Sequence, residues 1–326
     1  GNRMKMKKCG LGTTAIHGGA VKNPYGSLAV PVFQTSTFIF DSAEQGGKRF
    51  ALEEDGYIYS RLGNPTTSIL EARVAALEEG EAAVAMSSGM GAISSTLWTV
   101  LKAGDHVITD TTLYGCTFAL MNHGLTKFGV EVSFVDTSDL EAVKKAMKAN
   151  TRVVYLETPA NPNLKIVDLE AIATLAHTNP NTLVIVDNTF ATPFLQKPLS
   201  LGVDIVVHSA TKYINGHGDV VAGLAVTNQE LANQIRLIGV KDMTGSVLGP
   251  QEAYYILRGL KTFEIRMERH CKNAEKVVEY LCRHEQVEKV YYPGLVDHPG
   301  YAVAKKQMRA FGGMISFELK GGMEAG

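Results

Sequence analysis

The sequence predicts an α/β protein in which a mainly parallel β-sheet carries helices on both faces. From about residue 60 onward, short apolar runs alternate with helical patterns, and this alternation is typical of βαβ units. Several runs are apolar along their whole length, as in strands that are buried on both faces. The chain has 326 residues, of which 45% are hydrophobic and 20% charged, and this composition also predicts folded domains, about two in number.

The expected elements follow one another in a regular order. Residues 1–60 are irregular, with a turn at Asn23–Gly26, and we expect an arm that contacts a neighbouring subunit. A helix should begin at Asn64-Pro65, because a capping side chain precedes a proline in its first turn. Further helices are expected at Asp139–Ala149 and Leu169–His177. The seven expected strands are Ala82–Met86, His106–Thr109, Val132–Val135, Val153–Glu157, Leu183–Asp187, Ile205–His208 and Ala222–Val226.

The last part of the chain predicts a smaller α/β domain. A long helical pattern from Pro250 to about His284 should bend at Arg258-Gly259, and strands at Val287–Tyr292 and Gly313–Leu319 flank one more helix. We therefore expect an arm (1–60), a large ligand-binding domain (61–258) and a small C-terminal domain (259–326). Two strands and two helices form a poor independent core, so we expect either that the natural chain continues beyond Gly326 or that this domain packs against the large one.

Composition and spacing exclude several classes of protein. With 32 basic and 33 acidic residues, the chain is not expected to bind nucleic acid. Four cysteines without a C-x-x-C pair predict reduced thiols and a cytoplasmic location. The histidines have no metal-ligand spacing, so we assign no metal. Twenty uncharged residues lie between Glu81 and Lys102, but eight are Ser, Thr or Gly, which favours a strand, a turn and a buried helix over a membrane span.

A glycine-rich turn follows the first expected strand, in the sequence Ser87-Ser88-Gly89-Met90-Gly91-Ala92. In open α/β sheets ligands bind beyond the carboxyl ends of the strands, and free amides at the start of a helix hold phosphate well. The turn also resembles a weak dinucleotide-binding motif with Asp110 about twenty residues further on, although Ser94 replaces the third glycine. A tight packing turn without a ligand is the other interpretation.

Two further strand ends carry reactive groups. Asp187 ends the run Leu183–Asp187, and a carboxylate there needs a cationic partner, which could be a metal, a base or a protonated ring nitrogen; it could instead cap the next turn. Lys212 follows the run Ile205–His208, and a lysine partly removed from water can attack a carbonyl to form a Schiff base. The alternative for Lys212 is a solvated charge. Ser209 and Lys212 also match the Ser-x-x-Lys pattern of penicillin-binding acyltransferases, but the companion motifs are missing.

Taken together, the three strand ends point to one ligand. A phosphate-binding turn, an aspartate able to pair with a pyridinium nitrogen and a lysine able to bond an aldehyde are the anchors that pyridoxal 5'-phosphate requires. The sequence also resembles the pyridoxal-phosphate enzymes of cysteine and methionine metabolism, the cystathionine γ-synthase-like group of fold type I. The motifs that carry this resemblance are Tyr57-Ile-Tyr59-Ser-Arg61, Ser88-Gly89-Met90, Glu157-Thr-Pro-Ala-Asn161, Val186-Asp187 and His208-Ser-Ala-Thr-Lys212.

The resemblance implies a role for each matching residue. Lys212 would hold the cofactor and move protons, Asp187 would keep the ring nitrogen protonated, and Tyr114 would stack on the ring and act as acid to the departing thiolate. The remaining cofactor contacts would come from Ser88, Gly89, Met90, Asn161, Glu157, Ser209 and Thr211, with Tyr59 and Arg61 reaching into the adjacent subunit's site. Cys116, Lys241 and Asp242 would lie near the substrate side chain. In the family, the arginine that binds the substrate carboxylate lies beyond the position of Gly326.

Two stretches, Leu113-Tyr114-Gly115-Cys116-Thr117 and Gly239-Val-Lys241-Asp242-Met-Thr-Gly245, resemble the methionine γ-lyase branch of the family. This resemblance implies α,γ-elimination of L-methionine to methanethiol, 2-oxobutanoate and ammonia, in a homotetramer built from two dimers that share active sites. Cystathionine γ-lyase and O-acetylhomoserine sulfhydrylase activities use the same scaffold and remain alternatives. An alternative of another class is a catalytically silent protein that binds pyridoxal phosphate; a nicotinamide-dependent oxidoreductase is a further one.

Overall fold

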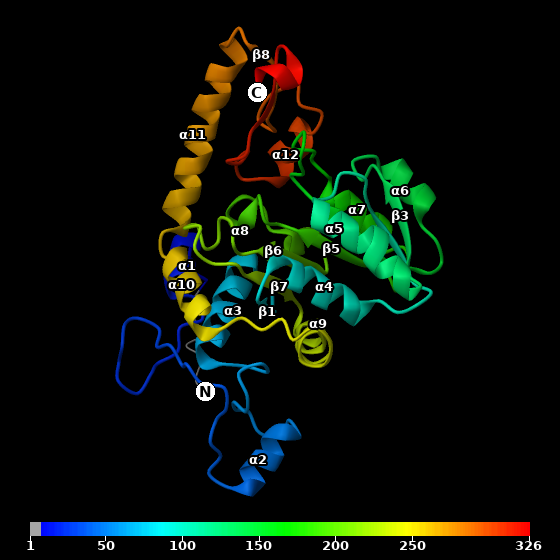
Figure 1. Cartoon of the computed structure of the whole chain (residues 1–326). Helices are drawn as coiled ribbons and strands as arrows, with labels where there is room; N and C mark the ends of the chain where they lie inside the picture. Colours follow the sequence, from blue (N-terminus) through cyan, green and yellow to red (C-terminus); the bar gives the residue numbers. More distant parts are fainter. Residues whose placement is uncertain (1–7) are drawn as a thin grey trace. The chain divides into compact units, whose positions relative to one another are not determined.

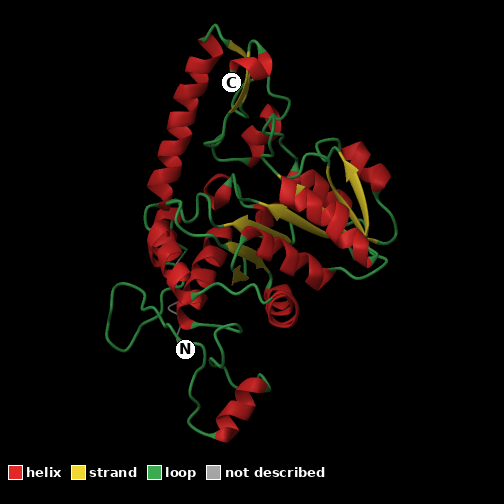
Figure 2. Cartoon of the chain, viewed as in Figure 1, coloured by secondary structure: helices red, strands yellow, loops and turns green. Residues whose placement is uncertain are grey.

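The computed structural model describes residues 8–326 (Figures 1 and 2). By their internal contacts, these residues divide into two compact units. Unit 1 contains the chain up to Thr99 together with His208–Phe263, and unit 2 contains Val100–Val207 together with Glu264–Gly326. These units group residues by their contacts within the folded chain. The division into an arm, a large domain and a small domain, with boundaries at residues 60 and 258, stays a prediction.

The strands confirm the predicted α/β class. Within residues 8–326 they form a seven-stranded sheet in the order β1-β7-β6-β5-β4-β2-β3 and a two-stranded sheet of β8 and β9. The pairs β2–β3, β2–β4, β4–β5 and β5–β6 are parallel, whereas β1 pairs with β7 and β8 with β9 antiparallel. The strands are β1 Ala82–Met86, β2 His106–Asp110, β3 Glu131–Val135, β4 Thr151–Glu157, β5 Leu183–Asp187, β6 Ile205–Ser209, β7 Gly223–Thr227, β8 Val287–Tyr291 and β9 Ser316–Leu319.

Unit 1 is organised around α3 Pro65–Glu78, which packs on β1. The Asn64 side chain accepts a hydrogen bond from the amide of Thr66, and Pro65 occupies the first turn, as the capping pattern predicts. Within α3, the apolar side chains of Leu70 and Val74 are fully buried. The other helices are α1 Leu11–His17, α2 Ala43–Phe50, α4 Gly89–Val100, α9 Gln229–Gln234, the π-helix η4 Ile235–Thr244 and α10 Pro250–Leu260.

Unit 2 holds the parallel strands β2, β3, β4 and β5, of which β2, β4 and β5 are buried almost throughout, whereas β3 is partly exposed. Aspartates at residues 139 and 168 cap the helices after β3 and before β5. A second core, around Ala274, Val278 and Tyr292, lies near the C-terminus. The helices are α5 Gly115–Ala119, η1 Leu120–Leu125, η2 Thr126–Phe128, α6 Leu140–Ala146, α7 Leu169–Ala176, α8 Thr192–Leu195, η3 Pro198–Leu201, α11 Phe263–Arg283, α12 Tyr301–Gln307 and η5 Gly322–Ala325.

The helical pattern from Pro250 onward differs from its prediction. The break lies at Lys261-Thr262, between α10 and α11, and not at Arg258-Gly259. Gly259 is needed for close packing, because a Cβ there would lie 2.2 Å from the carbonyl oxygen of Asn215. The amides of Lys261 and Thr262 bond instead to carbonyls three residues earlier, which ends α10.

The uncharged stretch between Glu81 and Lys102 forms β1, a turn and α4, as predicted. Among the helices of residues 8–326, none combines the length and apolar character needed to cross a membrane. Two short helices, α1 and α2, interrupt the region predicted to be irregular.

Candidate active site

The predicted site residues fall into two groups, one in each unit. Unit 1 contributes Tyr59, Arg61, Ser88, Gly89, Met90, Ser209, Thr211, Lys212, Lys241 and Asp242. Unit 2 contributes Tyr114, Cys116, Glu157, Asn161 and Asp187. Within each group the structure shows what holds the side chains in place.

The glycine-rich turn joins β1 to α4 and packs closely on neighbouring chain segments. The hydroxyl of Ser88 accepts a hydrogen bond from the amide of Gly91 at 2.9 Å, which starts the helix. A Cβ on Gly89 would lie 2.9 Å from the Cβ of Ser209, so only glycine fits there. A turn of this kind at a helix N-terminus is suited to binding phosphate.

The glycine-rich turn packs against Ser246, a contact that the sequence did not predict. The hydroxyls of Ser87 and Ser246 lie 2.8 Å apart, and a Cβ on Gly91 would lie 2.0 Å from the Ser246 oxygen. Gly91 therefore serves the packing of the segment after η4. No local signal in the sequence pairs two residues that are so far apart along the chain, so only the structure reveals this contact.

Lys212 lies in a turn directly after β6. The hydroxyl of Thr211 accepts a hydrogen bond from the amide of Ala222 at 3.1 Å, and the carbonyl of Lys212 accepts one from Gly216 at 2.8 Å. The expectation that Lys212 is partly removed from water is wrong, since the residue is exposed. The exposed stretch Gly216-His217-Gly218 that follows gives it little cover. Its amine is held by a fixed backbone yet accessible to a carbonyl compound.

Four predicted residues of unit 1 form a second cluster. Arg61 donates a hydrogen bond to the carbonyl of Lys241 at 2.8 Å, and its guanidinium lies 5.4 Å from the centre of the Tyr59 ring. The Lys241 ammonium lies 3.3 Å from the Asp242 carboxylate. The residues predicted for the phosphate and those predicted for the substrate side chain are thus linked within one chain.

In unit 2, two carboxylates lie side by side at the carboxyl ends of β4 and β5. Glu157 and Asp187 are partners in the register of the parallel pair. Burial, followed by the charge of Asp187, raises the pKa of Glu157 to about 8. The amide and hydroxyl of Thr189 donate to Oδ1 of Asp187 at 3.0 and 2.5 Å. Glu157 therefore keeps its proton at neutral pH, beside the carboxylate of Asp187, to which a cationic ligand could bind. The Asp-x-Thr spacing was a signal that a turn orients Asp187.

Tyr114 precedes α5 and contacts the predicted residues around it. Its side chain is 62% exposed, and its amide donates a hydrogen bond to Oε2 of Glu157 at 3.4 Å. The thiol of Cys116 lies 3.8 Å from the Tyr114 hydroxyl. The structure therefore brings Tyr114, Cys116 and Glu157 together, with the phenol facing solvent where a substrate can reach it.

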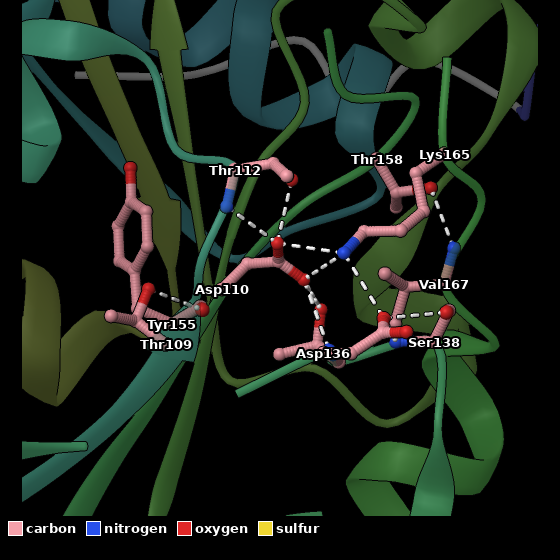
Figure 3. Close-up of polar contacts among 10 residues, drawn as sticks. Thr109, Asp110, Thr112, Asp136, Ser138, Tyr155, Thr158, Lys165 and Val167 are labelled. Carbon is pink, nitrogen blue, oxygen red and sulfur yellow. Dashed lines mark hydrogen bonds and ion pairs between the residues drawn. The ribbon is translucent and has the colours of Figure 1, made fainter. Parts of the chain in front are cut away.

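Asn161 lies in the loop that the bridge between Ala160 and Lys165 closes, and Lys165 also forms an ion pair with the buried Asp110 (Figure 3). Ala160 and Lys165 exchange two backbone hydrogen bonds, and Asn161 is exposed between them. The Lys165 ammonium lies 2.7 Å from the Asp110 carboxylate. Asp110, which the sequence offered as the acidic residue of a dinucleotide motif, is engaged here in contacts within the protein. Among residues 8–326, no group of three His, Cys, Asp or Glu side chains is placed to hold a metal ion.

These residues fit pyridoxal phosphate. The turn at Gly89, too tight for a side chain, suits the phosphate. The carboxylate of Asp187, beside the protonated Glu157, suits a protonated ring nitrogen, and the exposed amine of Lys212 suits the aldehyde. The phosphate, the ring nitrogen and the aldehyde of the cofactor thus each have a chemical counterpart on this chain.

Comparisons with known proteins support the same conclusion. The family model described as Cys/Met metabolism PLP-dependent enzyme matches residues 12–326. The L-methionine gamma-lyase of Fusobacterium nucleatum subsp. nucleatum is 81% identical over 99% of this chain and 82% of its own length. That of Treponema denticola is 60% identical over 100% of this chain and 81% of its own length. The crystal structure of cystathionine gamma-lyase from Lactobacillus plantarum has a TM-score of 0.89 and 45% identity, covering 96% of this chain and 79% of that one.

Proposed function

Because the chain belongs to the family of Cys/Met metabolism PLP-dependent enzymes, we propose that it is a carbon–sulfur lyase acting on L-methionine. The reaction is an α,γ-elimination in which L-methionine and water give methanethiol, 2-oxobutanoate and ammonia. The observation that carries the proposal is the high identity, over nearly the whole chain, to relatives named for this activity.

When bound, pyridoxal phosphate draws electrons from an attached amino acid and so makes its Cα proton acidic. Asp187, with one oxygen fixed by Thr189, holds the proton of the ring nitrogen. The amine of Lys212 would accept the Cα proton and pass it on to C4' of the cofactor. Neutral again, it could then accept a proton from Cβ, which the loss of a γ-substituent requires. Phosphate is bound by the residues of the turn and of the β6 end: Ser88, Gly89, Met90, Ser209 and Thr211.

Residues at and beyond the carboxyl end of β4, after β2 and in η4 contact the ring and the leaving group. Glu157, whose pKa of about 8 keeps it largely protonated at neutral pH, donates a hydrogen bond in the cofactor site together with Asn161. The hydroxyl of Tyr114 gives its proton to the departing sulfur. Cys116, Lys241 and Asp242 shape the region that receives the substrate side chain.

The active enzyme is a homotetramer of two dimers in which Tyr59 and Arg61 complete the neighbour's site. Large apolar side chains exposed on the arm support this assembly, because such surface is usually covered by a partner. They include Tyr25, Leu28, Ile39, Phe50 and Leu52. The contact between Arg61 and the carbonyl of Lys241 further implies that these two residues serve the same site. The four cysteines, all without disulfide bonds, support a cytoplasmic location.

The proposed activity is tested by turnover. The protein supplied with pyridoxal phosphate and L-methionine should release 2-oxobutanoate, and Lys212→Ala should abolish both this release and the visible absorbance of the bound cofactor. Appreciable release by Lys212→Ala would overturn the role of the lysine.

Site sharing is tested by mixing two inactive chains. Coexpressed Lys212→Ala and Arg61→Ala chains should regain about a quarter of the wild-type activity, because half of the dimers are mixed and each mixed dimer has one intact site. If each site is built from a single chain, the mixture stays inactive.

A further inference from the structure

The Asp110 carboxylate is the centre of a buried polar network at the end of β2. The side chain is 2% exposed and accepts hydrogen bonds from the amide and hydroxyl of Thr112, at 2.8 and 2.6 Å, and from the amide and hydroxyl of Thr137. Lys165 lies 2.7 Å from both carboxylate oxygens and 3.0 Å from Asp136 (Figure 3). Burial alone would raise the pKa of Asp110, but these hydrogen bonds, first that from Lys165, outweigh it and keep the pKa low.

Two segments that meet at this carboxylate lead directly to proposed active-site residues. Thr112 stands two residues before Tyr114, and its amide and hydroxyl are both held by Asp110. Lys165 closes the hairpin that carries Asn161, through two backbone hydrogen bonds with Ala160 of 3.0 and 2.9 Å. The hydroxyl of Thr158 accepts a hydrogen bond from Val167 at 3.0 Å, which closes the hairpin one step further out.

We infer that Asp110 and Lys165 are positioning residues: their ion pair ties the loop of Tyr114 to the hairpin of Asn161 and fixes both at the carboxyl edge of the sheet. The inference rests on the proposed roles of Tyr114 and Asn161. A buried carboxylate with five donors keeps one geometry, because the loss of any donor leaves charge in a site that excludes water. A displacement of the two segments by about 1 Å is enough to lower the rate about 100-fold.

The same unit offers a matched control. Lys148 and Glu131 form an ion pair of the same chemistry and similar length, 2.9 Å, but both side chains are about half exposed. Glu131 begins β3 and Lys148 precedes β4, so this pair lies at the amino edge of the same parallel strands. Removing it tests the loss of a lysine ion pair without touching either segment.

The experiment compares Lys165→Met, Lys165→Arg and Lys148→Met in the full-length protein. Amide hydrogen exchange is measured over residues 111–117 and 158–167, without and with pyridoxal phosphate, and kcat and KM are measured with L-methionine. Lys165→Met should exchange at least about 10-fold faster in both segments, with kcat lowered about 10- to 100-fold, whereas Lys165→Arg should stay close to wild type. Lys148→Met should change neither readout.

Two outcomes overturn the inference: unchanged exchange and kcat in folded Lys165→Met, or equal losses in Lys165→Met and Lys148→Met. If Lys165→Met does not fold, Asp110→Asn, which retains an acceptor for Thr112, takes its place under the same criteria. A wild-type protein that releases no 2-oxobutanoate contradicts the proposed function and not the network, since the exchange measurement still reports whether the two segments are tied together.

Discussion

The two edges of the parallel strands in unit 2 both carry polar side chains, but these side chains differ in their charge and in their role. At the amino edge, His106 is buried and lies 2.7 Å from the Thr151 hydroxyl and 2.8 Å from that of Ser133. Burial is the main cause that lowers its pKa, so the ring is neutral. At the carboxyl edge, Glu157 and Asp187 are adjacent, and the pKa of Glu157 rises to about 8.

The difference indicates that polar residues at one edge of the sheet stabilise the fold, whereas those at the other edge serve ligand binding and catalysis. Polar groups at the amino edge satisfy one another, as neutral partners around His106 and as the opposite charges of Lys148 and Glu131, so they stabilise the fold without attracting a ligand. The carboxyl edge instead places two acidic side chains together, so that Glu157 keeps its proton at neutral pH, and a bound cation would stabilise the ionised form of the pair. Substitutions at the carboxyl edge should therefore change turnover, and those at the amino edge should change stability.

Asp187→Asn should have the largest effect, because an amide cannot hold the proton of the ring nitrogen. We expect kcat/KM for L-methionine to fall at least about 10³-fold. Glu131→Gln, a carboxylate neutralised at the amino edge, should stay within about twofold of wild type. Near-wild-type turnover by Asp187→Asn would contradict the claim that the acidic residues at the carboxyl edge are needed for catalysis.

Tyr114→Phe should lower kcat with L-methionine about 10²-fold, since the departing thiolate loses its acid. O-acetylhomoserine, whose acetate leaves without needing a proton, should be affected far less. Tyr280→Phe serves as the control, because that tyrosine is exposed on α11 and distant in sequence from the site. Equal losses with both substrates would show that Tyr114 does not act as the acid.

Glu157→Gln should change the pH dependence of stability in the cofactor-free protein. Glu157 holds its proton more tightly in the folded protein, with a pKa of about 8 against an ordinary 4.5. The folded state therefore loses stability as the pH rises between these two values, by an amount on the order of a few kcal/mol. Chemical unfolding at pH 5 and pH 8 should show this decline in wild type and a smaller one in Glu157→Gln; parallel declines would refute the shifted pKa.

His106→Ala should affect stability alone. The buried hydroxyl of Thr151 and the partly buried hydroxyl of Ser133 each lose one hydrogen-bond partner, which costs about 1–2 kcal/mol in the free energy of unfolding. Thermal unfolding measures the loss, and kcat/KM for L-methionine at a temperature where the variant is folded should match wild type. A drop in kcat/KM comparable to that of Tyr114→Phe would show that residues at the amino edge also affect turnover, which contradicts the proposed difference between the two edges.

Local sequence patterns were sufficient to predict most of the strands and the kinds of reactive side chain at the ends of these strands. Runs such as Leu183–Asp187 are apolar along their whole length, and the residues directly after such runs lie at the carboxyl edge of a parallel sheet whatever the rest of the fold does. The cap at Asn64 was similarly predictable, because capping depends only on its immediate neighbours.

Long-range pairs could not be predicted in this way. Lys165 finds Asp110 across 55 residues, and Ser246 finds Ser87 across 159, and neither residue carries a local pattern that names its partner. The exposure of Lys212 also escaped prediction, because it depends on the conformation of the Gly216-His217-Gly218 segment that follows. Tertiary packing decides these features, and it is encoded by residues far apart in the chain.

The most direct test of the account is a parallel assay of L-methionine and L-cystathionine with the protein supplied with pyridoxal phosphate. The released thiol and 2-oxobutanoate are quantified together for each substrate. The account predicts that L-methionine gives methanethiol and 2-oxobutanoate in equal amounts, at a kcat/KM that equals or exceeds that for L-cystathionine. Turnover of L-cystathionine alone would contradict the assignment to methionine, while leaving the roles of Lys212 and Asp187 intact.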